Sequence, residues 1–391
     1  MRPLRIGLNL VYLVRRAGGV GTYARELIPE LLQAEPGSRI VAFVSRELDS
    51  EDRSAPWAAE IEWVQLPVTV THGPAWNGLR VLRAQWATQP QAASRRGLDV
   101  IHGMANIAPL VAPGVATVVT LLDLIWLRDP GTMTSREILA MKCSAIPSAR
   151  TADRVIAISK AAQEDIVGTL GLRRDRISVT PLGVRVEGRV APSPESELRA
   201  QLDLGSQPVV LCVSQKRTHK NMAGLIRAMV GLDALLVLPG SPTPHELELR
   251  RLAQELGISG QVRFPGWLDE PQLERLYRIA SCFALPSFQE GFGLTVLEAM
   301  GRGVPVCCSN TSSLPEVVGD AGLMFNPEDV DDIRLAIGRL LADRRLAAEL
   351  AERGRRRSSI FTWRRTAEAT LDVYRRAIDE RRLLSLDRRR R

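Results

Sequence analysis

Short strand-like runs alternate with longer helical segments along the whole chain, and this order limits the fold more than any other feature. Apolar, β-branched runs separated by helices predict parallel strands joined by crossover helices. The expected strands are Arg5–Tyr12, Ile40–Ser45, Val100–Gly103, Thr117–Leu122, Arg154–Ser159, Ser178–Pro181, Pro208–Ser214, Ala234–Leu238, Gln261–Phe264, Ser281–Leu285 and Pro305–Cys308. We therefore expect an α/β protein with doubly wound sheets.

The same pattern divides the chain into two domains. The expected helices are Gly21–Ala34, Ser135–Ala149, Lys160–Leu170, Met222–Val230, Pro244–Leu256, Glu270–Ile279, Leu294–Arg302, Val330–Asp343, Leu346–Arg357 and Arg364–Leu384. The segment Glu187–Glu197 contains a glycine and two prolines, which is typical of a linker. We predict domains at 1–186 and 198–363, a linker at 187–197, and a last amphipathic helix with a basic tail at 364–391.

The net charge of +8 is confined to the end of the chain. Ala351–Arg391 contain 14 arginines and 6 acidic residues, whereas positions 1–350 hold 38 basic and 38 acidic residues. Binding to a phosphate backbone needs a clustered excess of cations, so this neutral body argues against nucleic acid as a partner. We expect Arg388–Arg391 to be a solvated end, with weak contact to an anionic membrane surface as the alternative.

The cysteines and the apolar runs indicate neither a disulfide framework nor a membrane span. The five cysteines are odd in number and lack the spacing of a disulfide framework or a metal site, so neither is predicted from them. The apolar run Ile6–Val14 contains Asn9 and lacks a small-residue cleavage site, which favours a strand over a signal peptide. No run approaches the roughly 18 apolar residues of a membrane span. The cytoplasm is the expected location, with peripheral membrane contact as the alternative.

Loops that follow strands are the expected place for chemistry, because ligands of open α/β sheets bind at the carboxyl ends of the strands. The loop at Pro286–Met300 turns at glycines and enters a helix near Gly293, whose free amides suit a diphosphate or sugar hydroxyls. In that helix Glu298 can hold the vicinal diol of a ribose, and Glu290 can do the same for a sugar. The alternative is a capping acid at Glu290 and a solvated helix face at Glu298.

Only four of the 52 basic residues are lysines, and two of them, Lys216 and Lys220, fall in one pentapeptide. A compact ammonium and a planar guanidinium are not interchangeable, so these lysines are candidates for phosphate binding. A solvated loop is the alternative. The glycine-rich turn Gly18–Gly21 follows the first strand, but such a turn also serves to relieve close packing.

The stretch Glu290–Val306 reads EGFGLTVLEAMGRGVPV, with seven residues between two glutamates. It strongly resembles the signature of family-4 retaining glycosyltransferases. Other stretches also resemble the family and occur in the same order along the chain, namely Gly18–Ile28, Asp99–Gly103, Arg154–Ile166, Val179–Val184, His219–Met229, Val262–Glu270, Ser312–Gly322 and Phe361–Tyr374. The resemblance implies a GT-B fold, with two Rossmann-like domains facing a deep cleft. The first would bind the acceptor, the second would bind a nucleotide-sugar, and the last helix would pack back on the first.

For the donor site, the resemblance implies that Glu298 holds the ribose, Glu290 lies against the hexose and Lys220 binds the phosphate. Residues around the helix start would line the sugar or the diphosphate: Gly291, Phe292, Gly293, Leu294 and Thr295. The family often has an arginine six residues before the lysine, where this chain has Ser214. Lys216 or Arg217 is then the candidate for a second cation.

Three more positions follow from the resemblance. Gly19 and Gly21 would lie in the loop that reaches toward the donor phosphates and the acceptor. Arg263 would lie near the nucleotide base, with simple core packing of Phe264 and Trp267 as the alternative.

Leu122 departs from the family pattern, in which a histidine usually precedes the aspartate that is Asp123 here. Family histidines at this position often approach the 6-hydroxyl of the sugar. A leucine cannot make that hydrogen bond but can pack against a methyl group. We therefore expect a 6-deoxy donor sugar, or one without C6, with loss of transfer activity as the alternative. Asp123 itself is expected to cap the next segment.

The resemblance as a whole implies a retaining, metal-independent hexosyltransferase. It would move a sugar from a nucleoside-diphosphate sugar, with no further cofactor, to an acceptor hydroxyl of a glycan, a lipid or a natural product. Two alternatives would bind the same donor: a non-catalytic nucleotide-sugar-binding protein and an epimerase, which the scarcity of histidine disfavours. The acceptor is expected at Pro67–Trp86, where His72, Trp76 and Trp86 could stack on a sugar or an aglycone.

Overall fold

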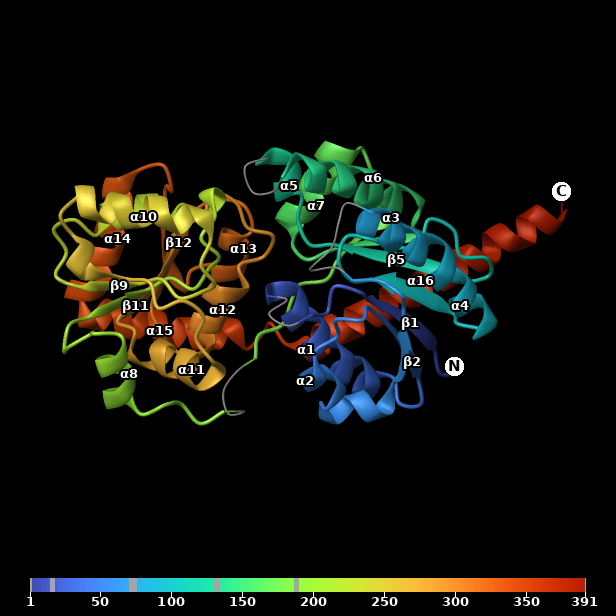
Figure 1. Ribbon diagram of the computed structural model, residues 1–391, viewed down its shortest axis with the longest axis horizontal. Helices are drawn as coiled ribbons and strands as arrows, with labels where there is room; N and C mark the ends of the chain where they lie inside the picture. The colour runs from blue at the N-terminus through green and yellow to red at the C-terminus, as the bar shows by residue number, and fades with distance from the viewer. Residues whose placement is uncertain (1, 15–17, 70–75, 130–133, 186–189, 391) are drawn as a thin grey trace. The chain divides into compact units, whose positions relative to one another are not determined.

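The computed structural model describes residues 2–14, 18–69, 76–129, 134–185 and 190–390. The chain divides into two compact units (Figure 1). Unit 1 comprises Met1–Gly183 together with Trp363–Arg391, and unit 2 comprises Val184–Thr362. Each unit is built around its own parallel sheet, which confirms the α/β class predicted from the alternation of strands and helices.

The sheet of unit 1 has seven strands in the order β3-β2-β1-β4-β5-β6-β7. All the neighbouring strands pair in parallel. The strands are β1 (Arg5–Leu10), β2 (Arg39–Val44), β3 (Glu62–Gln65), β4 (Val100–Gly103), β5 (Ala116–Leu121), β6 (Arg154–Ala157) and β7 (Ile177–Val179). The central strands are almost fully buried, as expected for a parallel sheet with helices on both faces.

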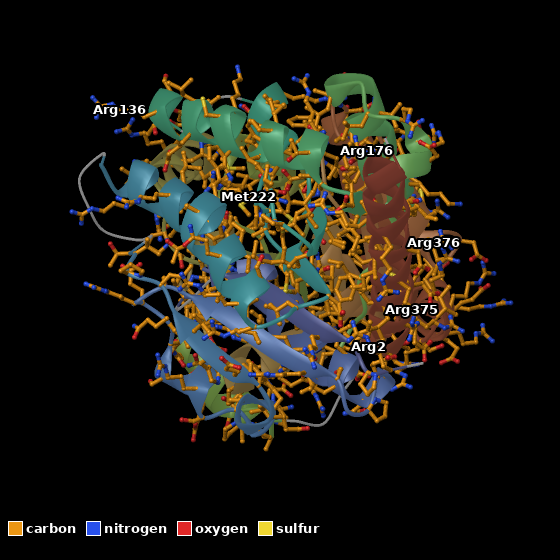
Figure 2. All side chains as sticks on the ribbon, turned by 90° about the vertical axis from the view of Figure 1, so that its right-hand side faces the viewer. Arg2, Arg136, Arg176, Met222, Arg375 and Arg376 are labelled. Carbon is orange, nitrogen blue, oxygen red and sulfur yellow. The ribbon has the colours of Figure 1, made fainter. Side chains whose placement is uncertain are left out.

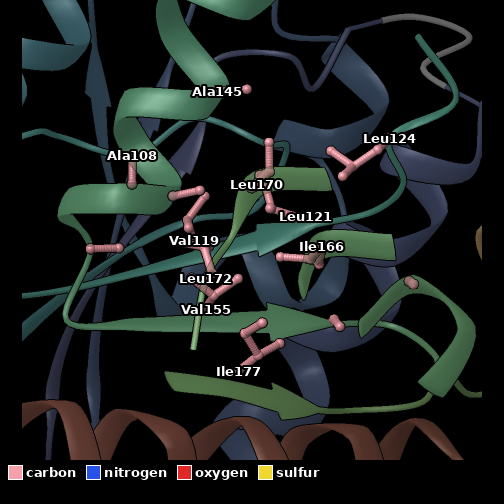
Figure 3. Packing of buried hydrophobic residues seen from close by; sticks show 14 of the residues in the cluster. Ala108, Val119, Leu121, Leu124, Ala145, Val155, Ile166, Leu170, Leu172 and Ile177 are labelled. Atoms are coloured by element: carbon pink, nitrogen blue, oxygen red, sulfur yellow. The ribbon is translucent and has the colours of Figure 1, made fainter. Parts of the chain in front are cut away.

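The helices of unit 1 are α1 (Gly18–Ala34), α2 (Ser50–Arg53), α3 (Trp76–Arg83), α4 (Gln89–Arg95), α5 (Ile125–Arg128), α6 (Ser135–Thr151) and α7 (Lys160–Leu170). Local sequence sets several of their ends. A capping box between Thr134 and Glu137 starts α6, and Gly171 in the left-handed conformation ends α7. Side chains from α6 and α7 then pack against β5 and β6 in one apolar cluster (Figure 3).

The last helix, α16 (Trp363–Arg390), belongs to unit 1, where it packs along α1 and across β5 and β6. Its buried face contains Leu371 and Tyr374, and Arg376 lies on its exposed face (Figure 2). A hydrogen-bond chain ties the helix to the sheet, because His102 of β4 lies 2.8 Å from the Tyr374 hydroxyl and 2.7 Å from that of Thr120. The side chains of Arg388–Arg391 lie outside the described residues.

Unit 2 has a six-stranded sheet in the order β10-β9-β8-β11-β12-β13, with all pairs parallel. The strands are β8 (Val209–Leu211), β9 (Leu235–Val237), β10 (Val262–Arg263), β11 (Cys282–Leu285), β12 (Val306–Ser309) and β13 (Gly322–Phe325). This is the strand order of a Rossmann fold, in which the chain reverses direction across the sheet between its first and fourth strands.

The helices of unit 2 are α8 (Glu195–Gln201), α9 (Met222–Ala228), α10 (Pro244–Glu255), α11 (Glu270–Ile279), α12 (Leu294–Gly301), α13 (Leu314–Val318), α14 (Val330–Ala342) and α15 (Arg344–Ser358). They cover both faces of the sheet, with α9, α10 and α14 on one face and α11, α12 and α15 on the other (Figure 1). Because β8 and β11 are parallel neighbours, their carboxyl ends lie next to each other at the centre of the sheet.

Two edge strands, β3 and β13, were not predicted from the sequence. Both are four residues long and only partly buried, so they lack the continuous apolar run of the central strands. The segment before β4 also forms more helix than expected, since α3 and α4 are joined by a π-helical turn at Ala84–Thr88.

Candidate functional site

The candidate site lies at the point in unit 2 where the strand order reverses. The chain leaves β8 into the loop that contains Lys216–Lys220, and it leaves the adjacent β11 into the loop that contains Glu290. In open α/β sheets the two loops at such a point separate to opposite faces and leave a crevice for a ligand.

Lys220 and Glu290 meet across this reversal point. The Lys220 ammonium donates to Oε1 of Glu290 at 2.8 Å, and Ser287 donates its hydroxyl to the same oxygen at 2.7 Å. The lysine side chain is 16% exposed and the glutamate side chain is 11% exposed. The pair is therefore largely desolvated, which strengthens its electrostatics, yet both groups keep some access to solvent.

The backbone of Glu290 is fixed by the loop after β12. Ser312 and Ser313 both donate hydroxyls to the Glu290 carbonyl oxygen, at 2.6 and 3.0 Å. The Glu290 amide donates in turn to the Ser312 hydroxyl at 3.2 Å. These serines were not predicted as site residues, although Ser312–Gly322 is one of the stretches that resemble the family.

The loop that carries Lys220 is fixed by its neighbour Asn221. This residue has a positive φ of 51° and caps α9 by accepting from the amide of Gly224 at 3.2 Å. Its amide nitrogen also donates to the carbonyl oxygen of Pro327 at 2.7 Å. Asn221 thus ties the turn that carries the Lys220 side chain to α9 and to Pro327.

The N-terminus of α12 lies next to Glu290. Gly293, with φ of 98°, is its N-cap, and a Cβ there would come within 2.6 Å of the Leu314 side chain. Leu294 and Thr295 in the first turn are half-buried, whereas Phe292 is buried against Phe361. The first amides of a helix have no partner within it, so this turn can donate to an anionic or hydroxyl-bearing ligand. Gly291 lies between Glu290 and this turn.

Glu298 lies one turn further along α12 and is half-buried. Its Oε2 accepts from the hydroxyl of Tyr277 at 3.1 Å, and its backbone carbonyl accepts from Arg302 at 3.1 Å. Tyr277 was not predicted as a site residue, and its only distinction in the sequence is that it is one of four tyrosines in the chain and the only one in unit 2.

Lys216 does not join this group as a free cation. Its side chain has no exposed surface, and its ammonium donates to the carbonyl oxygen of Gly240 at 2.9 Å and lies 3.4 Å from Glu246. Burial lowers the pKa of Lys216, and Glu246 opposes that shift. The expectation that Lys216 offers a second positive charge to a phosphate is therefore corrected: the lysine ties the loop after β8 to the loop after β9. Arg217, in the same turn, is half-buried and donates to the Gln215 side chain at 3.0 Å.

The guanidinium of Arg263 is also committed elsewhere. It donates to the carbonyl oxygens of Leu202, Asp203 and Gly260 and to the Asp203 carboxylate. Asp203 and Gly260 precede β8 and β10, whereas Lys220 and Glu290 follow their strands, so the structure does not bring the Arg263 guanidinium together with the Lys220–Glu290 pair. Trp267 is 49% exposed, so the alternative of simple core packing does not hold for this residue.

The remaining predicted residues belong to unit 1. Gly19 is exposed and Gly21 is buried in the first turns of α1. Leu122 is half-buried after β5, and its amide donates to the Asn106 side chain at 3.0 Å. Asp123 accepts from the amide of Ile125, the first residue of α5, at 3.1 Å, although the N-cap residue of that helix is Leu124.

In the expected acceptor segment, Trp86 is half-buried. His72 and the side chain of Trp76 lie outside the described residues.

Within the described ranges, no group of three or more His, Cys, Asp or Glu side chains is arranged to hold a metal ion. In the same part of the chain, none of the helices combines the length and apolar character needed to cross a lipid bilayer.

Two Rossmann-like parallel sheets define a protein of the GT-B class. The structure is similar to sucrose-phosphate synthase from Thermosynechococcus elongatus, with a TM-score of 0.77 and 23% identity over 96% of this chain and 100% of that one. It is also similar to Anabaena HepE in complex with UDP and glucose, with a TM-score of 0.74 and 19% identity over 94% and 98% of the two chains. These likenesses concern the fold.

Sequence comparison identifies the family. The profile described as "Glycosyltransferase Family 4" matches residues 17–187, and the profile described as "Glycosyl transferases group 1" matches residues 194–357. A D-inositol 3-phosphate glycosyltransferase from Nocardia farcinica is 30% identical over 90% of this chain and 79% of its own length. The chain therefore belongs to glycosyltransferase family 4.

The match to another relative covers less than a third of that protein. The serotype-specific mannosyltransferase WbdA of Escherichia coli is 34% identical over a region that is 58% of this chain and 29% of WbdA.

Proposed function

We propose that this protein transfers a glycosyl group from a nucleoside-diphosphate sugar to an acceptor hydroxyl, with retention of configuration at the anomeric carbon. The Lys220–Glu290 pair carries the proposal. It combines a cation with a carboxylate that can accept from sugar hydroxyls, at the point in unit 2 where the strand order reverses. Relatives whose names specify glycosyl or mannosyl transfer support the reaction class, and the HepE complex with UDP and glucose supports the type of donor.

In this reaction the bond between the anomeric carbon and the diphosphate oxygen breaks, and its electron pair leaves with the diphosphate. Lys220 and the first amides of α12 stabilise the negative charge that develops there. The acceptor oxygen bonds to the anomeric carbon on the face that the diphosphate leaves, and its proton passes to a phosphate oxygen. On this route no side chain is a covalent nucleophile and no metal ion is required at the diphosphate.

Glu290 and Glu298 act as acceptors for sugar hydroxyls. Glu290 orients the transferred sugar, and its contact with Lys220 gives way as the donor phosphate enters. Glu298 holds the ribose diol through its carboxylate. The acceptor, a glycan, a lipid or a small molecule, would bind through unit 1.

We further propose that Leu122 selects a donor sugar without a 6-hydroxyl. A hydroxyl left unpaired against leucine would cost about 1–3 kcal/mol, whereas a methyl group packs there. The hypothesis rests on the family position that Leu122 occupies, and a mannosyl donor is its strongest competitor, because several relatives are named for mannosyl transfer.

Turnover assays test the proposal. The protein is incubated with UDP-, GDP- and dTDP-linked sugars, each in a 6-hydroxyl and a 6-deoxy form, with and without acceptors. Acceptor-dependent release of the nucleoside diphosphate supports transfer, and the anomeric configuration of the product tests retention. Conversion of the donor without release would indicate an epimerase, and binding without either reaction would indicate a binding protein. Faster transfer of 6-hydroxyl than of 6-deoxy sugars would contradict the role given to Leu122.

A further inference from the structure

A buried phenol supports the carboxylate of Glu298 from the neighbouring helix. Tyr277 of α11 donates its hydroxyl to Oε2 of Glu298 over 3.1 Å. The tyrosine is 1% exposed, whereas the glutamate is only half-buried. Water therefore has little access to the donor, while the carboxylate keeps access to a ligand.

The position of the Tyr277 ring is itself well determined. Phe283 of β11 stacks on it with the ring centroids 6.0 Å apart, and the Arg302 guanidinium lies 4.7 Å from its centroid. Arg302 is anchored by Glu274, to which it donates at 2.6 Å. Since its neighbours fix the ring, the direction of the phenol O–H toward Glu298 is fixed as well.

The chemistry of the two groups suits a supporting role. Burial raises the pKa of Tyr277 well above its usual value, so the phenol stays protonated and remains a donor at neutral pH. An ionised carboxylate has about four acceptor positions, so the hydrogen bond from Tyr277 does not exclude hydrogen bonds from ligand hydroxyls. Residues that support a binding group in this way restrict its rotamer and sharpen its selectivity.

We infer that Tyr277 is a positioning residue for ribose recognition, because it holds the Glu298 carboxylate in the orientation that receives the 2′- and 3′-hydroxyls of the nucleotide. This inference rests on the proposed function, in which Glu298 binds the ribose. The site should then prefer ribonucleotides over 2′-deoxyribonucleotides, because a 2′-deoxyribose lacks the 2′-hydroxyl that would donate to the Glu298 carboxylate.

Binding measurements on the full chain test this role. Dissociation constants of UDP and 2′-deoxy-UDP, and of GDP and 2′-deoxy-GDP, are measured for the wild type, Tyr277→Phe and a matched control, Tyr374→Phe. The control removes a buried phenol from unit 1. We expect the wild type to bind at least one ribonucleotide about tenfold more tightly than its 2′-deoxy form. Tyr277→Phe should reduce this ratio to about threefold or less, and the control should leave it unchanged.

The outcomes separate the inference from the proposed function. A folded Tyr277→Phe variant that keeps the wild-type ratio overturns the role of Tyr277 alone. A wild type that binds neither ribonucleotide, or that does not discriminate, contradicts the ribose site at Glu298 itself. If Tyr277→Phe does not fold, Arg302→Lys takes its place, because it keeps a cation beside Glu274 and removes the planar group over the ring. An unchanged ratio in that variant likewise overturns the inference.

Discussion

The Lys220 ammonium lies 2.8 Å from a carboxylate oxygen of Glu290, a residue 70 positions later in the chain. The two loops involved follow β8 and β11, which are neighbours in the sheet although they are the first and fourth strands of unit 2. The Rossmann strand order therefore creates the pair, and it places a cation and an acid where this fold binds nucleotides.

Replacing either member of this pair should abolish transfer without unfolding the protein. For Glu290→Gln and Lys220→Met we expect kcat to fall by about 10²–10³-fold, because Glu290 orients the transferred sugar and Lys220 stabilises the charge that develops on the leaving diphosphate. Steady-state kinetics and thermal melting of each variant provide the measurements. Lys142→Met, which removes an exposed lysine of unit 1, is the matched control. Near-normal turnover in either site variant would refute the assignment.

Lys216 should matter for stability rather than for donor affinity. Lys216→Met removes the buried cation beside Glu246 and leaves that acid paired with Arg250 alone, so we expect a loss of about 1–3 kcal/mol in the free energy of unfolding. Adding Glu246→Gln should restore part of that loss, because it removes a buried charge that has lost one of its two cations. Urea denaturation measures both effects. If Lys216→Met keeps its stability but raises the KM for the donor, the lysine binds the phosphate after all.

The buried His102 should make unit 1 sensitive to acid. Burial lowers the pKa of His102 from 6.5 to about 3, so between these values the unfolded chain binds a proton that the folded chain does not. The free energy of unfolding is then highest above pH 6.5 and falls as the pH drops toward 3, by up to about 1.4 kcal/mol per pH unit from this group. Urea denaturation between pH 4 and 7 should show a steeper decline for the wild type than for His102→Gln. Equal slopes would contradict the role of His102.

Leu122→His should change the choice of donor sugar. A histidine there can pair with a 6-hydroxyl, so we expect the ratio of kcat/KM for 6-hydroxyl over 6-deoxy donors to rise by about tenfold. Competition assays with paired donors on the same base measure this ratio. An unchanged ratio would show that position 122 does not contact the C6 substituent.

The central strands and the glutamate loop could be predicted because their signals are local. Runs such as Pro208–Ser214 and Ser281–Leu285 contain β8 and β11, and the turn at Gly293 marks the start of α12. The edge strands β3 and β13 could not be predicted, because a short, half-buried strand has no distinct period in sequence.

The hydrogen-bond and ion-pair partners of the site residues could not be predicted from the sequence. Lys216 and Lys220 are four residues apart and have the same chemistry, yet one is buried against Gly240 and the other pairs with Glu290. Tyr277 reaches Glu298 from a different helix, and no local pattern encodes that contact. Such pairings depend on how loops and helices meet in three dimensions, which a single sequence does not show.

Thermal shift measures whether Lys220 and Glu290 form the donor site. The wild type and Lys220→Met are melted with UDP-, GDP- and dTDP-sugars at matched concentrations. A ligand at 100 times its Kd adds about 2.7 kcal/mol to the stability of the native state. We predict that sugars on one base raise the melting temperature of the wild type by several degrees and leave that of Lys220→Met nearly unchanged. No shift with any donor, or equal shifts in both proteins, would show that Lys220 and Glu290 do not form the donor site.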